Sequence, residues 1–257
     1  MRSRHILLAA GAVLGAWFGP RAEALGSSFQ VTPISIALSA REPSAVLTIH
    51  NESADSLRFQ ASVFSWRHDG AGEPVLSETQ DVVCFPSLLA VAPGARAHLR
   101  VGTVIAAEAV EKAYRVFIEE LPRANDGTSA RPREHAITIL TRMGIPVFLA
   151  PAGGSALAQA SIADMAFERG VLSFALRNPG AVHFRALSVQ VRGVGASGAP
   201  TFQRESAGGY ILAGESRPYR LEIPPAERCA TAAVVIRIST AGAPVERRVE
   251  LPHQPCT

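Results

Sequence analysis

Short runs of alternating apolar and polar residues dominate the chain from residue 29 onward. A period of two is that of a strand with one buried face, whereas the 3.6-residue period of an amphipathic helix is scarce here. Asn, Gly and Pro turns separate the runs at spacings of about ten residues, as in a β-sandwich or barrel. The pattern therefore predicts an all-β chain. The first runs are FQVTPISIAL (29–38), SAVLTIHN (44–51) and RFQASVFSW (58–66).

A change of composition divides this pattern into two sets of strands. Residues 152–161, AGGSALAQAS, are small and flexible, as in a linker between domains. The strand-and-turn phrase VLTIHNES at 46–53 has a counterpart in LSFALRNPG at 172–180. A chain of 257 residues is long enough for two domains. We predict two related β-sandwiches in tandem, one at residues 25–152 and one at 153–257.

The N-terminus has the layout of a secretory signal peptide. Arg2 and Arg4 precede an apolar run at 6–19, and PRAEA at 20–24 contains the small-x-small cleavage pattern. The run is shorter than the roughly 20 residues that a membrane-spanning helix needs. We expect cleavage between Ala24 and Leu25, export of the remaining chain, and no insertion of that mature chain into a membrane.

The three cysteines fit an exported protein. An oxidising compartment permits disulfides, and Cys229 and Cys256 lie within the same predicted domain. The sequence does not show whether their Cα atoms come within bridging distance, so the Cys229–Cys256 disulfide is a candidate only. Cys84 is left over, and we expect it to be buried and unreactive.

Known catalytic and nucleic-acid-binding patterns are absent from the sequence. It contains no H-E-x-x-H, C-x-x-C, G-x-S-x-G or Walker motif, and its seven His residues lack metal-ligand spacing. Glu119 and Glu120 are adjacent on a predicted strand, so their side chains face opposite ways. The net charge is +3, with Arg residues scattered rather than clustered. We expect neither an enzyme nor a nucleic-acid-binding protein, and no cofactor or metal.

One apolar stretch, HAITILTRMGIPVFLAP at 135–151, raises a question of its own. It is nearly uncharged and rich in β-formers, and Pro146 within it indicates an edge strand. A bare apolar edge promotes aggregation, so something is expected to cover it. Read in steps of two, one face carries Ile137, Ile139, Thr141, Met143 and Ile145. Alternation alone leaves open whether this face packs into its own sandwich or against another polypeptide.

Several segments, in order and spacing, resemble the periplasmic pilus-assembly chaperones of the PapD-like superfamily. The segment with the strongest resemblance is YRVFIEELP at 114–122. Together with Pro146, it makes the sequence most similar to the archaic Csu-type, or spore-coat U, branch. The resemblance covers almost the whole predicted mature chain. The other matching segments are FQVTP at 29–33, LTIHN at 47–51, IPVFLAP at 145–151 and NPGAVH at 178–183.

The resemblance implies two immunoglobulin-like domains arranged as a boomerang, acting in the periplasm without a cofactor. Such a chaperone binds pilin or spore-coat-like subunits, donates a strand that completes the subunit's fold, and delivers the subunit to an outer-membrane usher. The donated strand would be the apolar stretch above, with Ile137, Ile139, Thr141, Met143 and Ile145 as its contact face. The resemblance also allows the free protein to cap itself as a dimer.

The chain departs from the family in the basic pair that anchors the subunit's C-terminal carboxylate. Ser35 and Pro146 occupy the aligned positions, and neither can pair with an anion. A carboxylate buried without a partner is costly, so a cation is still expected. The candidates are Arg115, Arg142 and Arg100, in that order.

Two alternatives stay open. A secreted two-domain β-sandwich adhesin or carbohydrate-binding module would have a similar strand pattern. Such modules display aromatic platforms, and only Trp66 and three Tyr residues are available beyond the predicted signal peptide. An enzyme that uses Cys84 ranks third.

Overall fold

The computed structural model describes residues 25–122, 138–153 and 156–251. Apart from the short helix α1 (Pro225–Ala230), every regular element in these ranges is a strand, which confirms the predicted all-β class. Contacts divide the described chain into two units. The smaller one is the parallel pair β1 (Leu25–Gly26) and β11 (Thr138–Ile139). Both sandwiches belong to the larger unit.

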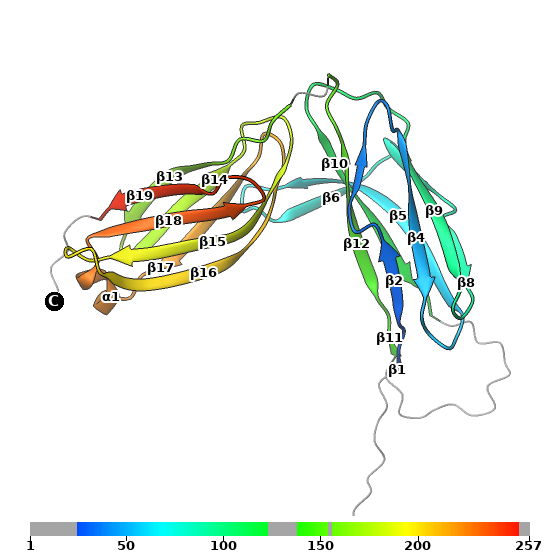
Figure 1. The fold of residues 1–257 in the computed structure, drawn as a ribbon, viewed down its shortest axis with the longest axis horizontal. Coiled ribbons are helices and arrows are strands. Elements are labelled where there is room, and N and C mark those ends of the chain that lie inside the picture. The colour runs from blue at the N-terminus through cyan, green and yellow to red at the C-terminus, as the bar shows by residue number, and fades with distance from the viewer. Residues whose placement is uncertain (1–24, 123–137, 154–155, 252–257) are drawn as a thin grey trace, which may run out of the picture. The chain divides into compact units, whose positions relative to one another are not determined.

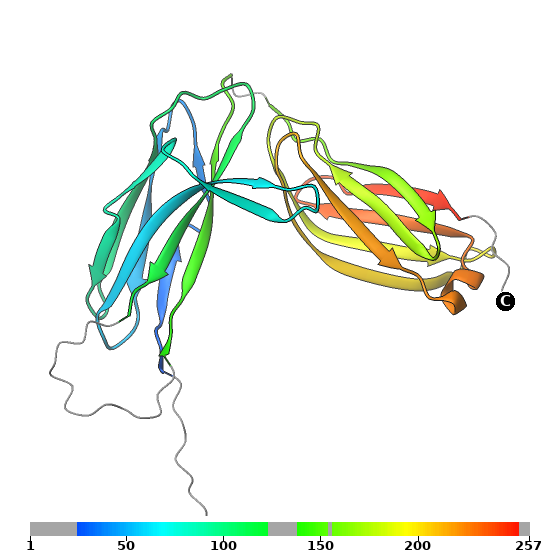
Figure 2. The ribbon, with the colours of Figure 1, turned by 180° about the vertical axis from the view of Figure 1, so that it is seen from behind.

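The first sandwich consists of two sheets, visible from both sides in Figures 1 and 2. One has the order β2–β4–β9–β7: Phe29–Thr32, Ser44–Asn51, Arg96–Thr103 and Val82–Phe85. The other has the order β3–β12–β10–β5–β6, with β8 also paired to β5: Ile36–Leu38, Arg142–Leu149, Lys112–Glu120, Leu57–His68, Pro74–Glu78 and Leu88–Val91.

The alternation in the sequence corresponds to burial between these sheets. Leu47 and Ile49 of β4 face inward beside Leu99 of β9, and Val116 and Ile118 of β10 come from the opposite sheet. All five side chains are fully buried, and the residues between them face outward. Removing alternate apolar side chains of every strand from water is what holds the two layers together.

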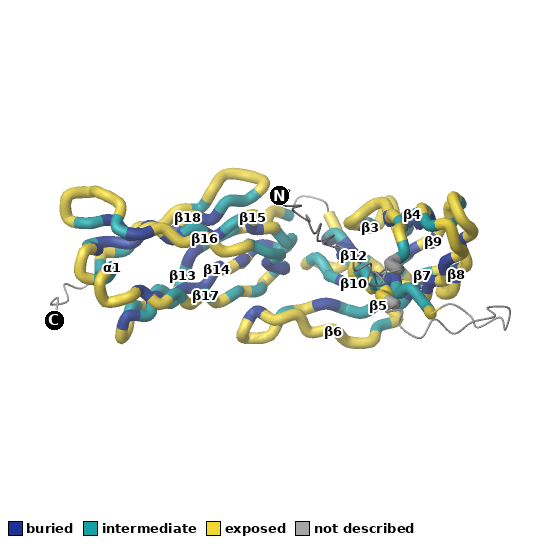
Figure 3. Tube along the Cα trace, turned by 90° about the horizontal axis from the view of Figure 1, so that it is seen from below, coloured by how far each residue is buried: buried dark blue, intermediate teal, exposed yellow. Residues whose placement is uncertain are grey.

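The second sandwich has its own core between two further sheets, and Figure 3 shows buried residues along the strands of both. The first sheet is β13–β14–β17: Ser161–Glu168, Val171–Arg177 and Ser216–Glu222. The second is β16–β15–β18–β19: Pro200–Ile211, Phe184–Val194, Ala233–Thr240 and Val245–Glu250. The boundary predicted between residues 152 and 153 stays a prediction.

The sequence phrase repeated in the two halves corresponds to one structural device. Asn51 ends β4 and Asn178 directly follows β14, and the two residues are 0% and 1% exposed. The Asn51 amide donates to the carbonyls of Asp55 and Val91, both at 2.8 Å, and the Asn178 amide donates to that of Val182 at 2.8 Å. Each Asn therefore satisfies backbone acceptors that its turn would otherwise bury unpaired.

Candidate functional site

Strand β12 is paired along its whole length on one flank only. Residues 142–149 pair antiparallel with β10. On the other flank, β3 pairs in parallel with Val147–Leu149 alone. Within the described ranges, residues 142–146 therefore have no strand beside them on that flank. This is the edge position that Pro146 predicted.

The hydrogen-bond phase of β12 determines which backbone groups this open edge presents. The Glu120 N–H donates to the Thr141 carbonyl at 2.9 Å, so these opposite residues form a hydrogen-bonded pair. In an antiparallel ladder such pairs alternate with pairs whose backbone groups point outward. Arg142 and Gly144 consequently turn their N–H and C=O groups to the open edge. Pro146 shares this outward phase, and it has no N–H that would remain unpaired.

The structure divides the residues predicted for the donated face. Ile145 is 1% exposed and belongs to the core of its own sandwich, and Met143 packs against that core. Thr141 is half-buried, and Ile139 is 54% exposed. Ile137 lies outside the described residues. The end of β12 nearest β3 thus serves the protein's own core, whereas Ile139 projects into solvent.

Arg115 lies on the outer face of β10, opposite Pro146 of β12. Its guanidinium carbon is 4.0 Å from the centre of the Trp66 ring. The Arg115 Nε is buried and has no hydrogen-bond partner, and the side chain forms no ion pair with any described residue. Removal from water lowers the pKa of Arg115 below its usual value. Arg115 is therefore a partly desolvated cation that no anion among the described residues neutralises.

The other two candidate anchors have different surroundings. Arg142 forms an ion pair with Glu119 through its Nε, and its guanidinium carbon lies 4.0 Å from the centre of the Phe117 ring. Arg100 lies on β9 of the opposite sheet, where it donates to the Ser44 hydroxyl at 3.0 Å. The structure therefore brings Arg115 and Arg142 to β12 and its neighbour β10, but not Arg100.

Sequence reasoning missed two contributors to this face. Trp66, considered only as a sugar platform, is 2% exposed and packs with Phe148 and Leu212. It therefore presents no open aromatic surface to a glycan. Gly144 lies opposite Phe117, and a Cβ there would approach the Phe117 ring to 3.0 Å. A glycine inside a strand signals such a close approach, so this second feature was readable from sequence.

The remaining candidate residues do not gather into a site. Cys84 is half-buried against the first core, and burial raises the pKa of its thiol, as expected for an unreactive cysteine. Cys229 is exposed on α1. Cys256 lies outside the described residues, so the disulfide stays a prediction. The same holds for cleavage after Ala24, which is also outside them, while Leu25 begins β1.

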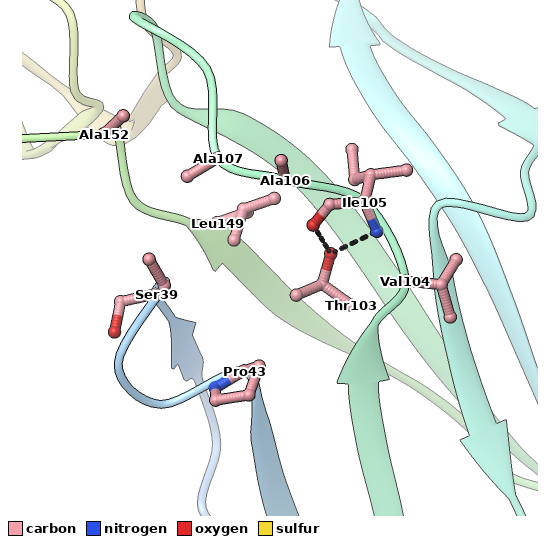
Figure 4. A pocket seen from close by; sticks show the side chains of 10 residues that line it. Ser39, Pro43, Thr103, Val104, Ile105, Ala106, Ala107, Leu149 and Ala152 are labelled. Atoms are coloured by element: carbon pink, nitrogen blue, oxygen red, sulfur yellow. Dashed lines mark hydrogen bonds between the residues drawn. The ribbon is translucent and has the colours of Figure 1, made fainter.

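A cavity of about 560 Å³ in the second sandwich is lined by His183, Arg185 and Tyr210, among others. A cavity of about 490 Å³ lies beside Leu149, but no charged side chain lines it (Figure 4). The Thr103 hydroxyl there is already bonded to the backbone of Ile105. Among the described residues, no three His, Cys, Asp or Glu side chains could hold a metal ion. Within the described ranges, no helix has the length and apolarity that crossing a membrane requires.

Residues 28–155 match the family described as pili and flagellar-assembly chaperone, PapD N-terminal domain. This segment belongs to that family. The match contains all of the first sandwich from β2 to β12, including the half-open strand and Arg115. It confirms the resemblance to PapD-like chaperones inferred from YRVFIEELP. No curated protein matches the chain in sequence.

Solved structures of PapD-like chaperones have the same fold over nearly the whole chain. One contains the CsuC chaperone with the tip adhesion subunit CsuE, from archaic Csu pili of Acinetobacter baumannii. It is 18% identical with a TM-score of 0.59, and the alignment covers 86% of this chain and 97% of the other. The CupB2 chaperone of Pseudomonas aeruginosa is 16% identical with a TM-score of 0.53, covering 87% and 100%.

The class 5 fimbriae chaperone CfaA is similar at 14% identity, with a TM-score of 0.55 and coverage of 88% and 100%. At these identities the likeness establishes the fold. It confirms two immunoglobulin-like sandwiches in tandem, the architecture of PapD-like chaperones. Residues 28–155 thus belong to the pilus-assembly chaperone family, and the fold of the described chain is that of PapD-like chaperones.

Proposed function

We propose that this PapD-like protein is a periplasmic chaperone that binds pilus or coat subunits by adding its β12 edge to the subunit's incomplete sheet. The observation that carries the proposal is the unpaired flank of β12 at residues 142–146. In β-strand addition, backbone hydrogen bonds supply affinity and alternate side chains supply specificity. The outward N–H and C=O groups of Arg142 and Gly144 are available for such bonds.

The side chains at this end of the stretch add an apolar contribution. Ile139 is largely exposed, and Met143 is only partly covered by its own core. Fully burying an exposed aliphatic side chain contributes about 1.5–3 kcal/mol. Ile145 is already buried, so a subunit gains contact from Ile139, Thr141 and Met143.

Arg115 is the best anchor for the subunit's C-terminal carboxylate. It lies on the strand beside the open edge and has no anionic partner among the described residues. A carboxylate would restore the interactions that its partly buried guanidinium lacks. Arg142 ranks second because Glu119 already neutralises it.

Delivery to an outer-membrane usher requires a further surface, and the segment connecting the two sheets of the first sandwich provides one. Phe85 ends β7 with 78% exposure, and Leu88 begins β8 with 63% exposure. Two large apolar side chains exposed three residues apart are unusual for a surface without a partner. We assign usher contact to this segment. Phe85→Asp should then leave subunit capture intact and reduce pilus display.

The strand-addition proposal is tested by co-expression with a pilus subunit that lacks its last strand. We expect the combined variant Ile139→Asp and Met143→Asp to lose the subunit in affinity capture. Val75→Asp, on the exposed strand β6, is a matched control that should retain it. Retention of the subunit by the combined variant would refute donation through this face.

A self-capping dimer of the free protein would use the same open edge. Size-exclusion chromatography of the protein without a subunit tests this, and the combined variant should then elute as a monomer. A dimer that persists in that variant must form elsewhere.

A further inference from the structure

Two neighbouring buried donors in the first sandwich have no acceptor. The Trp66 indole Nε1 and the Arg115 Nε are both inaccessible to solvent and without a hydrogen-bond partner. Within the described residues, the Tyr219 hydroxyl is the one other side-chain atom with this status. A buried indole N–H usually finds an acceptor, because leaving it unpaired forfeits its hydration. The lack of an acceptor for both of these neighbouring donors therefore needs an explanation.

Their positions suggest a common acceptor. The Arg115 guanidinium lies over the Trp66 ring at 4.0 Å, so the two side chains are in contact. Phe148, Leu212, Tyr210 and His68 pack around the indole. Glu119 of β10 is engaged by Arg142, and Glu215 is engaged by His68. Among the described residues, neither the indole N–H nor the Arg115 Nε has a hydrogen-bond acceptor.

We propose that Trp66 is a specificity-determining residue of the anion site, its indole N–H donating to the same carboxylate that Arg115 binds. This rests on the proposed anchoring of a subunit's terminal carboxylate. A carboxylate has two oxygens that only accept, which suits two adjacent donors. A terminal amide has one oxygen and an NH₂ group, and that NH₂ would face a donor. Trp66 therefore makes the site select a free C-terminus.

The test uses the indole resonance, since Trp66 is the only tryptophan in residues 25–257. The ¹⁵N–¹H signal of this indole is followed while the protein is titrated with N-acetylglycine or N-acetylglycinamide. We expect a saturable downfield shift with the acid and none with the amide. Arg115→Gln should abolish the response, and Arg96→Gln, on β9 of the opposite sheet, should preserve it. An indole signal that ignores the acid, or responds equally to both compounds, overturns the proposal.

A second measurement separates this inference from the proposed function. Trp66→Phe keeps an aromatic ring beneath Arg115 but removes the N–H, so subunit affinity should fall by about tenfold, the effect of one hydrogen bond. The fold of the variant is checked by its thermal unfolding. If the subunit binds and requires Arg115, yet Trp66→Phe binds it equally well and the indole signal is unchanged, the anchor stands and the role of Trp66 is wrong.

Discussion

Replacing Arg115 by Met should change stability and subunit binding very differently. In the free protein the guanidinium is partly desolvated and lacks an anion, a situation that costs about 1–3 kcal/mol. Met keeps an unbranched stem on the Trp66 ring but loses the cation–π contact, which contributes about 0.5–2 kcal/mol. The two effects oppose each other, so the free energy of unfolding should fall by no more than about 1 kcal/mol and can rise by up to about 2.5 kcal/mol.

Binding should respond far more strongly. Removing one member of a buried charge pair costs about 2–5 kcal/mol, or roughly 30- to 5,000-fold in affinity. Urea denaturation of the free protein measures the first quantity, and competition binding with a purified subunit measures the second. Arg142→Met is the control, since its exposed ion pair with Glu119 is worth about 0–1 kcal/mol. Unchanged subunit affinity in Arg115→Met would refute the anchor, and a loss of stability of several kcal/mol would refute the unpaired-cation argument.

Four further predictions follow from the packing. Ile145→Asp should prevent folding, as judged by circular dichroism, whereas Ile139→Asp should unfold at the wild-type urea concentration, because only Ile145 is buried. Gly144→Val should lower the free energy of unfolding in urea by about 1–3 kcal/mol, since the added side chain meets the ring opposite. Asn178→Ala should cost about 1–3 kcal/mol in the same assay by removing the hydrogen bonds of its amide to the carbonyls of Val182, Ile211 and Leu212, the last of which still accepts from the Glu215 N–H; an unaffected midpoint would contradict its role in the turn. Burial raises the pKa of the Tyr114 hydroxyl above its unfolded value of about 10. The stability that this hydroxyl contributes is therefore complete below that pH and is lost progressively as the pH rises above it. Tyr114→Phe should weaken this alkaline loss of stability, as measured by urea titrations across pH.

The alternating runs were sufficient to predict the sandwiches, because burial in a two-layer β-fold follows the same period. Leu47 and Ile49 are buried as their alternation predicted. The β-formers at residues 229–240 do not all lie in a strand: Cys229 lies in α1, and β18 begins only at Ala233. Pro224 precedes that helix and Pro225 begins it, and Pro is well suited to a helix start. This signal was present but was outweighed by the β-formers that follow.

The site was only partly accessible from sequence, because it depends on which strands become neighbours. Arg100 was a reasonable candidate until β9 was found in the opposite sheet from β12. Alternation could not distinguish Ile145 in its own core from Ile139 in solvent, since both have the same parity. The buried Trp66 N–H could not be anticipated either, as its isolation depends on packing by Phe148 and Leu212.

Because the backbone of Pro146 faces the open edge, it limits how many residues of a bound strand can pair with β12. Arg142 and Gly144 can each donate and accept, but the proline nitrogen offers nothing, and β3 occupies the flank from Val147 onward. The hydrogen-bond ladder is therefore short, and a bound strand held by so few backbone hydrogen bonds can dissociate from one end. A competing strand that forms more backbone hydrogen bonds would displace it step by step, without any input of chemical energy.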